Sequence, residues 1–477
     1  MRKIEKGWIF PLLCLLLAAG LTACGTNGNE DLPPEQEEGV LIYAALNPVS
    51  EELSISIKRF NLYHEDVQIR VQDYSDENGM ERLFTELSLG RVPDIMEMHR
   101  LGGNIDDAWS TLPYKDRACE AWLPYRQLAQ KGYLEDLWPY IENDPALGLD
   151  GVLMPPLKAA EVNGGLYMIF PEVSITTLMG PEHIVGGRCG WTLDELMETY
   201  SAMPEGSTIL RYNTNRWDMF SMLCAPLLEQ YVDMETGENS FDSQGFRDMV
   251  EFLDSFPEEV KTTLSADGIR AELIDRILSG EQMLDATTLS AMWYITYDDL
   301  FFGAPVSYIG YPTADGSLGS FFNLHGSKLA MSSACRNKEA AWEFMRKMLT
   351  AKYDTAALRD MDGYGGTRKI NINLANYNLA IKFDLTYNRW VDARDPDRKF
   401  LAGPFSEPLF EVDMPDEDDL IRFETLLNDT TQIYWPENDL SEIVWESIGP
   451  YFAGDRTMDE TIQMVQNRVG LYLNENR

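Results

Sequence analysis

The sequence predicts an α/β protein in which helices cover a parallel sheet, and three observations support that class. Residues 40–98 alternate short apolar segments with amphipathic ones in the order strand, helix, strand, helix, strand. This order is typical of parallel sheets, whose strands need helical crossovers. Hydrophobic residues make up 44% of the chain and aromatic residues 11%, the composition of a folded protein. Residues 40–477 are too many for one compact core, so the length predicts two or three domains.

The beginning of the chain has the pattern of an export signal. A basic start is followed by an apolar run of about 14 residues, Trp8–Leu21, too short for a membrane-spanning helix. The tetrad Leu21-Thr22-Ala23-Cys24 resembles the bacterial lipobox, in which the cysteine is lipidated and becomes the mature N-terminus. We therefore expect a lipoprotein signal peptide over residues 1–23 and a lipid on Cys24. An ordinary secretory signal with a chance cysteine, or an anchor that is not removed, remains open.

A tether is predicted between this cysteine and the folded part. Residues 24–39 are mostly glycine, polar and acidic residues with two prolines, and they hold a single aliphatic side chain. Such a segment cannot bury enough apolar surface to offset the entropy lost on ordering, so we expect it to be disordered. The folded part would then lie at the extracellular face of the cytoplasmic membrane, or in the periplasm if the cell has an outer membrane.

The elements of the first predicted unit follow in order. Strands are expected over Val40–Leu46, Val67–Gln72 and Asp94–Met98, and helices from the cap Ser50 to Phe60 and over Met80–Leu89, where Gly90 ends the helix. Ligands of open parallel sheets lie beyond the carboxyl ends of the strands. This position makes Asn47, Asp73 and His99 candidate ligand-binding residues.

Further elements are predicted along the rest of the chain. Helices are expected over 122–130, from 191 with Thr192 and Glu195 as a capping box, and over 247–256, 337–348 and 459–473; strands over 163–171, ending at Pro171, and 328–333; and a tight turn at 233–238.

Net charge and motifs exclude several classes of function. The formal net charge of −39 repels nucleic acid and anionic headgroups, so we expect no nucleic-acid partner and membrane contact through the lipid only. It favours a neutral or cationic ligand, unless a local basic pocket overrides it. The four histidines lack metal-ligand spacing, and no nucleophile elbow or phosphate loop is present. We predict no catalytic residue, cofactor or metal, and expect a monomer.

Aromatic side chains in loops are the candidates for binding a sugar, since a sugar stacks its C–H face on Trp or Tyr. Trp217 follows a polar loop, and Trp293 lies in an apolar run after residues 280–288. Trp109 and Tyr364 are weaker candidates, Tyr364 because glycines flank it. A place in the core is the alternative for each of these residues, equally compatible with Trp217 and Trp293 and the favoured reading for Trp109 and Tyr364. Four cysteines of the mature chain, Cys119, Cys189, Cys224 and Cys335, could form a disulfide or stay free, and the sequence does not decide between these outcomes.

Eight segments together make the chain similar to the extracellular solute-binding protein family 1, the sugar-binding lipoproteins of ABC importers. They are FTELSLGRVPD from Phe84, LAQKGYLEDL from Leu128, Asn163–Pro171, WTLDEL from Trp191, DMETGENSFDS from Asp233, GYPTADG from Gly310, NKEAAWEF from Asn337 and YFAGDRT from Tyr451. The segment from about 373 to 438 matches no pattern of that family.

The resemblance implies a type II periplasmic-binding-protein-like fold, with two hinged α/β lobes and a ligand cleft between them. The first lobe would hold 40–169 plus 311–365, and the second 170–310 plus 366–477. The implied function is capture of an extracellular mono- or oligosaccharide and its delivery to an ABC permease that works with a separate ATPase. A sensing or adhesion lipoprotein of the same fold, or a secreted carbohydrate hydrolase, remains the alternative.

Overall fold

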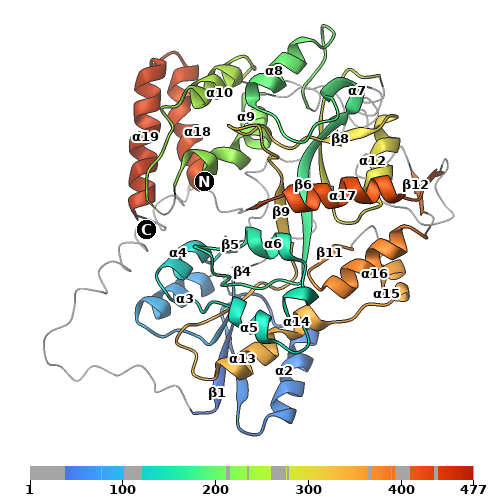
Figure 1. Cartoon of the computed structure of the whole chain (residues 1–477). Helices are drawn as coiled ribbons and strands as arrows, with labels where there is room; N and C mark the ends of the chain where they lie inside the picture. Colours follow the sequence, from blue (N-terminus) through green and yellow to red (C-terminus); the bar gives the residue numbers. More distant parts are fainter. Residues whose placement is uncertain are drawn as a thin grey trace, which may run out of the picture.

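A computed structural model describes residues 38–76, 78–100, 121–210, 215–233, 236–258, 276, 279–363, 368–387, 389–392, 409–434 and 439–475 (Figure 1). The predicted signal peptide, Cys24, Trp109, Cys119 and Tyr364, and most of the predicted tether, lie outside these residues. Within the described residues, no helix is both long and apolar enough to cross a membrane.

The first sheet has four strands in the order β10-β3-β1-β2. Strand β1 (Val40–Ala45) pairs in parallel with β2 (Gln68–Asp73) and β3 (Ile95–Glu97), and β10 (Leu329–Met331) joins β3 antiparallel. The crossovers are α2 (Glu51–Tyr63) and α3 (Gly79–Ser88). Ser50 caps α2 by accepting a hydrogen bond from the Leu53 N–H. The predicted order of strands and helices is therefore confirmed.

The second sheet has the long strand β6 (Glu172–Pro181) at its centre, and in Figure 1 this strand runs from the lower part of the molecule into the upper part. Its partners are β7 (Asp285–Leu289), β8 (Val306–Tyr308), β9 (Phe321–His325) and β11 (Ile370–Asn371), all antiparallel to it. Strand β14 (Gln432–Ile433) adds to β9 in parallel.

Two predicted boundaries are wrong. The strand expected to end at Pro171 begins after it, because residues 172–181 find several partner strands whereas Ile169 makes only an isolated bridge to Leu329. The helix expected from Trp122 begins at Tyr125, since Pro124 disfavours a helical conformation in the residue before it. Trp122 instead lies in β5 (Ala121–Trp122), paired with β4 (His99–Arg100).

The remaining elements follow in chain order. They are α4 (Tyr125–Gln130), α5 (Trp138–Asn143), η4 (Leu149–Gly151), α6 (Met154–Ala159), α7 (Glu182–Val185), α8 (Leu193–Ser201), α9 (Arg216–Met219), η5 (Phe220–Cys224), η6 (Ala225–Tyr231), α10 (Gln244–Asp254), α12 (Tyr294–Phe302), α13 (Lys338–Met345), α14 (Lys347–Thr350), α15 (Thr355–Gly363), α16 (Leu374–Asp384), β12 (Arg389–Asp392), β13 (Leu409–Val412), α17 (Glu417–Asp429), α18 (Asp439–Phe452) and α19 (Met458–Glu475). The predicted capping box of Thr192 and Glu195 is present at α8.

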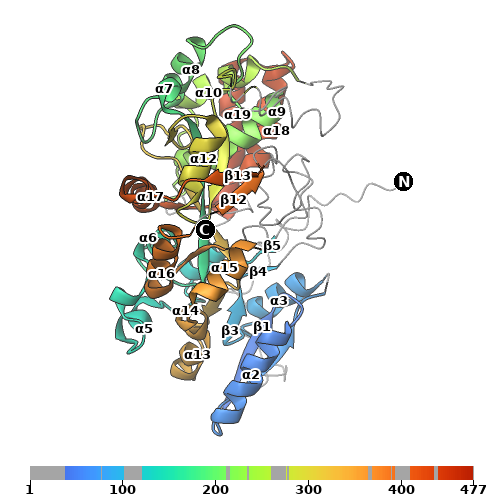
Figure 2. The ribbon, with the colours of Figure 1, turned by 90° about the vertical axis from the view of Figure 1, so that its right-hand side faces the viewer.

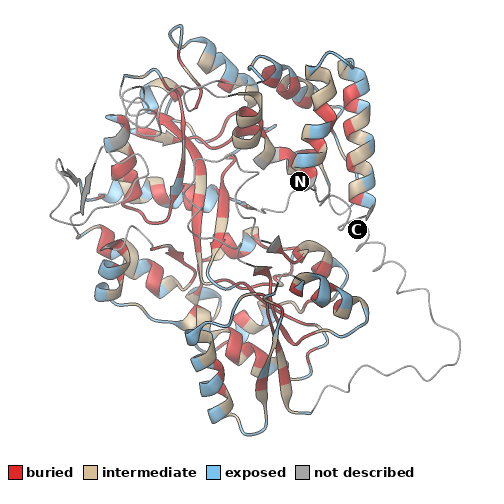
Figure 3. Cartoon of the chain, turned by 180° about the vertical axis from the view of Figure 1, so that it is seen from behind, coloured by how far each residue is buried: buried red, intermediate tan, exposed pale blue. Residues whose placement is uncertain are grey.

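Buried side chains form two hydrophobic clusters, and Figure 3 marks the buried residues in red along the ribbon. The first cluster draws on residues 41–179, 289–308, 322–377 and 423–433, and the second on 178–284, 309–321 and 440–473. Strands β6 and β9 contribute to both. Figure 2 shows α2 and α3 at the end of the molecule opposite to α8 and α10. The lobe boundaries remain a prediction, because the clusters report side-chain packing and not a hinge axis.

Cys189, Cys224 and Cys335 are free thiols, so no disulfide joins any two of these three. Cys224 and Cys335 are buried, and burial raises the pKa of each thiol to about 12. Thiols held in this protonated state behave as small apolar side chains.

Candidate functional site

One face of the central sheet is polar where β6 and β9 pass between the two hydrophobic clusters. Side chains of a strand alternate between its two faces. Val173 and Ile175 of β6 lie in the first cluster, so Ser174 and Thr176 lie on the opposite face. The register pairs Ser174 with Asn323 of β9 and Thr176 with Thr288 of β7.

These side chains form two hydrogen-bonded groups, one of Thr288, Thr176 and Asn323 and one of Ser174 and His325. The Asn323 amide donates to the Thr176 hydroxyl at 2.6 Å, and the hydroxyls of Thr176 and Thr288 lie 2.9 Å apart. Ser174 Oγ lies 2.8 Å from His325 Nε2. Thr288 is exposed and Thr176, Asn323 and His325 are partly exposed, whereas Ser174 is fully buried. We call these five residues the hydroxyl face; its uncharged donors and acceptors suit a ligand that carries many hydroxyl groups.

The strand ends of the first sheet are held together by a buried carboxylate, Glu97. Its Oε1 accepts the Tyr43 hydroxyl at 2.9 Å, and its Oε2 accepts the backbone N–H groups of Leu46 and Asn47, each at 2.9 Å. The Asn47 amide nitrogen donates to Glu97 Oε2 and to the His99 carbonyl, both at 2.9 Å. Asn47 and His99 are thus brought together as strand-end geometry predicts.

His99, at these strand ends, contacts a buried lysine. Lys328, which is 3% exposed, places its Nζ 3.0 Å from His99 Nε2 and 5.2 Å from the centre of the Trp122 ring. Burial, and after it the charge of Lys328, lowers the pKa of His99 to about 3. Burial, then Lys369 and Lys328, lowers the pKa of His325 to about 3 as well. Both imidazoles are therefore neutral at pH 7.

Asp73 lies apart from this arrangement. It is exposed at the end of the edge strand β2, where its carboxylate accepts the Ser75 N–H at 2.8 Å and its carbonyl accepts the Arg82 guanidinium at 2.7 Å. Hydrogen bonding from Ser75 is the main reason that the pKa of Asp73 is lowered. The Asp73 carboxylate thus stabilises the turn that follows β2. Its contact with a ligand stays a prediction.

The two described aromatic candidates differ in burial. Trp293 is 2% exposed and belongs to the first hydrophobic cluster, with its ring 4.5 Å from that of Tyr294. Trp217 is partly buried at the start of α9 and meets Trp445 of α18 edge-on at 4.8 Å. Trp217 is therefore only partly covered, whereas Trp293 packs inside the protein in this structure.

An ion pair joins the regions of the two hydrophobic clusters. Arg126 follows Tyr125 of the first cluster on α4, and Glu229 follows Leu228 of the second on η6. Arg126 Nη1 lies 2.8 Å from Glu229 Oε2, and about one third of each side chain is exposed.

Sequence reasoning missed the hydroxyl face, Glu97 and Lys328. The sequence does carry a pattern that indicates the strands of the hydroxyl face. Polar and apolar residues alternate in Glu172-Val-Ser-Ile-Thr and in Phe322-Asn-Leu-His. No pattern in the sequence pairs these strands with each other.

Within the described ranges, no group of three or more His, Cys, Asp or Glu residues is arranged to hold a metal ion.

Comparisons with known proteins were made at the level of sequence and of structure. No family model matches the sequence, and no curated protein matches it. The structure is similar to that of a periplasmic oligogalacturonide binding protein from Yersinia enterocolitica, with a TM-score of 0.53 and 13% identity over 92% of this chain and 100% of that one. At this identity the likeness shows the fold, and it confirms the predicted class of a periplasmic-binding-protein-like α/β fold.

Two further structures span most of the chain with lower scores. One is an extracellular solute-binding protein family 1 structure from Alicyclobacillus acidocaldarius, with a TM-score of 0.47 and 13% identity over 91% of this chain and 98% of that one. The other is the sugar-binding protein MalE from Xanthomonas citri, with a TM-score of 0.48 and 13% identity over 91% of this chain and 97% of that one.

Proposed function

We propose that this chain is the substrate-binding lipoprotein of an ABC importer, and that it captures an extracellular mono- or oligosaccharide and delivers it unchanged to a membrane permease. The observation that carries the proposal is the hydroxyl face, a row of uncharged hydrogen-bonding side chains on strands that pass between the two hydrophobic clusters. The fold is the one seen in the oligogalacturonide binding protein, which supports a binding role in place of catalysis.

Binding would couple to closure of the two lobes. A ligand seated against the hydroxyl face would also contact side chains of both lobes, so it favours the state in which those contacts are made together. The Arg126–Glu229 pair is a contact of this kind, since its partners belong to regions that pack in different clusters. The closed form would then dock on the permease, and a separate ATPase would supply the energy. Permease genes beside this gene would support import, whereas a lone histidine kinase gene would favour sensing.

Thermal-shift measurements against a sugar library test the function, because a ligand that binds only the folded state raises the melting temperature. We expect Thr176→Val, which removes one hydroxyl from the hydroxyl face, to weaken the binding of a sugar hit about five- to tenfold with little change in melting temperature. Small-angle X-ray scattering should show the protein becoming more compact as the sugar binds.

The neighbouring residue provides a matched control. Thr177 lies on the opposite face of β6, where its buried hydroxyl accepts from Ser320 at 2.7 Å. Thr177→Val should lower stability by about 1–3 kcal/mol, because it leaves a buried hydroxyl without its partner, and should leave the affinity unchanged. Equal affinities of the Thr176→Val variant and the wild type, or a sugar released in altered form, would contradict the proposal.

The lipid anchor has a separate test. Cys24→Ser removes the thiol that would carry the lipid, so we expect the full chain to move from the membrane fraction to the soluble fraction with its ligand affinity unchanged. Fractionation of cells followed by immunoblotting measures the distribution. A variant that stays in the membrane fraction would show that residues 1–23 act as a permanent anchor instead.

A further inference from the structure

The last turn of α2 carries the two most exposed large apolar side chains that the structure describes. Leu62 is 74% exposed and Tyr63 is 76% exposed, whereas every other described side chain of this kind is at most 61% exposed. Residues three, four and seven positions apart lie on one face of a helix, so Ile55, Arg59 and Leu62 form a single outer stripe with Tyr63 at its edge. Ile55 is exposed as well. Helix α2 is therefore apolar on the side that faces away from the core.

The packing of the helix end keeps these two side chains outside. Phe60 is fully buried on the core side of α2, and the ring of His64 stacks on it with the ring centres 3.9 Å apart. The backbone N–H of His64 donates to the Phe60 carbonyl at 3.1 Å, and His64 Nε2 lies 3.1 Å from Glu343 Oε2. Phe60 and His64 therefore occupy the core side of this turn, and Leu62 and Tyr63 remain at the surface.

The chain that leads from Cys24 enters the folded part at the same end of the molecule. Gly39 directly precedes β1, and its carbonyl accepts the N–H of Gln68, the first residue of the strand that follows α2, at 2.8 Å. Figure 1 shows β1 and α2 reaching the lower end of the molecule together. Only residues 25–38 separate Cys24 from Gly39. At a maximum of about 3.6 Å per residue, they hold this end within about 50 Å of a lipid on Cys24.

The local charge does not repel a membrane at this end, although the whole chain has a net charge of −39. Three bases and three acids lie in or beside the last two turns of α2: Lys58, Arg59, Lys347, Glu65, Asp66 and Glu343. Their charges cancel, so the repulsion expected from the net charge is weakest here. Exposed apolar side chains, a tyrosine and neighbouring basic residues are the combination typical of helices at the headgroup level of a bilayer.

We propose that the last turn of α2 contacts the membrane surface, with the side chains of Leu62 and Tyr63 inserted at the level of the lipid headgroups. The proposal goes beyond ligand capture and rests on the proposed function only through the lipid on Cys24. Two apolar side chains bind a bilayer weakly by themselves. A short tether raises their effective concentration at the membrane into the millimolar range, at which a weak contact is occupied. The membrane is then contacted by the protein surface as well as by the lipid.

This contact would set the direction of the candidate site. Ser50, at the other end of α2, follows the strand-end residue Asn47 by three positions, and the 13 residues of the helix span about 20 Å. With Leu62 and Tyr63 on the bilayer, the strand ends at Asn47 and His99 point away from it, toward the medium that carries the ligand.

Quenching of tryptophan fluorescence by brominated lipid tests the contact. The lipid-anchored full chain is reconstituted into phosphatidylcholine vesicles with and without bromine near the headgroup end of the acyl chains. In Leu62→Trp, the added tryptophan should lose most of its emission to bromine, beyond the loss that the wild type shows. Leu471→Trp is the matched control, since Leu471 is 61% exposed on α19. Its added emission should not be quenched, and both variants should melt like the wild type because both side chains are exposed.

The outcomes separate this proposal from the proposed function. Emission at position 62 that is quenched no more than emission at position 471 would overturn the membrane contact and leave the lipoprotein assignment standing. Emission at position 62 that shifts to shorter wavelength without quenching would show that a second copy of the chain covers α2, which also overturns the contact. A wild-type chain that carries no lipid would overturn the lipoprotein assignment and this proposal together.

Discussion

Replacing Arg368 by methionine is expected to lower the free energy of unfolding by about 3–5 kcal/mol, the effect of removing one partner from a buried ion pair. The guanidinium lies 3.1 Å from a carboxylate oxygen of Asp362 and 2.5 Å from one of Asp384. The exposed fractions of the side chains of Arg368, Asp362 and Asp384 are 2%, 8% and 1%. Without the arginine, two buried carboxylates lose the cation that lies between them, so urea unfolding should shift to much lower concentrations.

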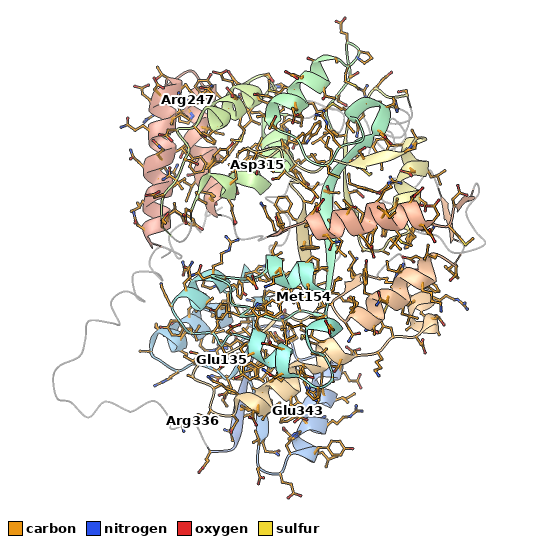
Figure 4. The ribbon with its side chains drawn as sticks, in the orientation of Figure 1. Glu135, Met154, Arg247, Asp315, Arg336 and Glu343 are labelled. Atoms are coloured by element: carbon orange, nitrogen blue, oxygen red, sulfur yellow. The ribbon has the colours of Figure 1, made fainter. Side chains whose placement is uncertain are left out.

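An exposed ion pair of similar length is the control. Arg247 of α10 is labelled in Figure 4. It lies 2.8 Å from Asp459 of α19, whose side chain is 86% exposed. Arg247→Met should change the stability by less than about 1 kcal/mol, since solvent screens the pair. Equal losses in the two variants would show that the Arg368 triad contributes no more than a surface contact.

The second large effect is expected at Trp293. Trp293→Ala removes a large ring that is 2% exposed in the first hydrophobic cluster, and such a deletion leaves a cavity. We expect a loss of about 3–5 kcal/mol of stability, measured by thermal and urea unfolding. The adjacent rings of Tyr294 and Tyr297, at 4.5 and 6.2 Å, would lose their packing partner.

Trp217 and a conservative variant complete this test. Trp217→Ala removes a partly buried ring, so we expect a smaller loss of stability and, if this ring stacks on the ligand, a loss of affinity. Trp293→Phe retains most of the buried surface and should fold. A Trp293→Phe variant that melts like the wild type yet binds sugar much more weakly would assign Trp293 to the ligand site, as the sequence predicted.

Local patterns predicted much of the fold because they depend on neighbouring residues alone. The cap at Ser50 and the capping box of Thr192 and Glu195 are contacts within three residues, and both are present. The order of strands and helices over residues 40–98 follows from periodicity, and it too is confirmed. The boundaries near Trp122 and Pro171 were misplaced, since there the choice between helix, strand and loop depends on partners distant in the sequence.

The candidate site was predicted only at its strand ends. Asn47 and His99 meet because parallel strands end at one edge of a sheet, a rule that needs only the positions of the strands in the sequence. Lys328 reaches His99 across 229 positions of the chain, and Thr176 reaches Asn323 across 147. Neither contact can be predicted from one sequence, because no local pattern at these positions indicates a distant partner.

The class of the fold, the order of the first strands and helices, and the expectation of an exported lipoprotein all follow from the amino-acid sequence. The first two depend on hydrophobic periodicity, capping and composition, and the third on the charged start, the short apolar run and the resemblance of residues 21–24 to a lipobox; all of these are local in the sequence. Three other properties emerge only in the folded molecule: which polar residues share a face, which lysine lies beside which histidine, and the burial of Arg368 between two carboxylates. These depend on antiparallel register and on the packing of segments far apart in the sequence, and no local preference encodes them.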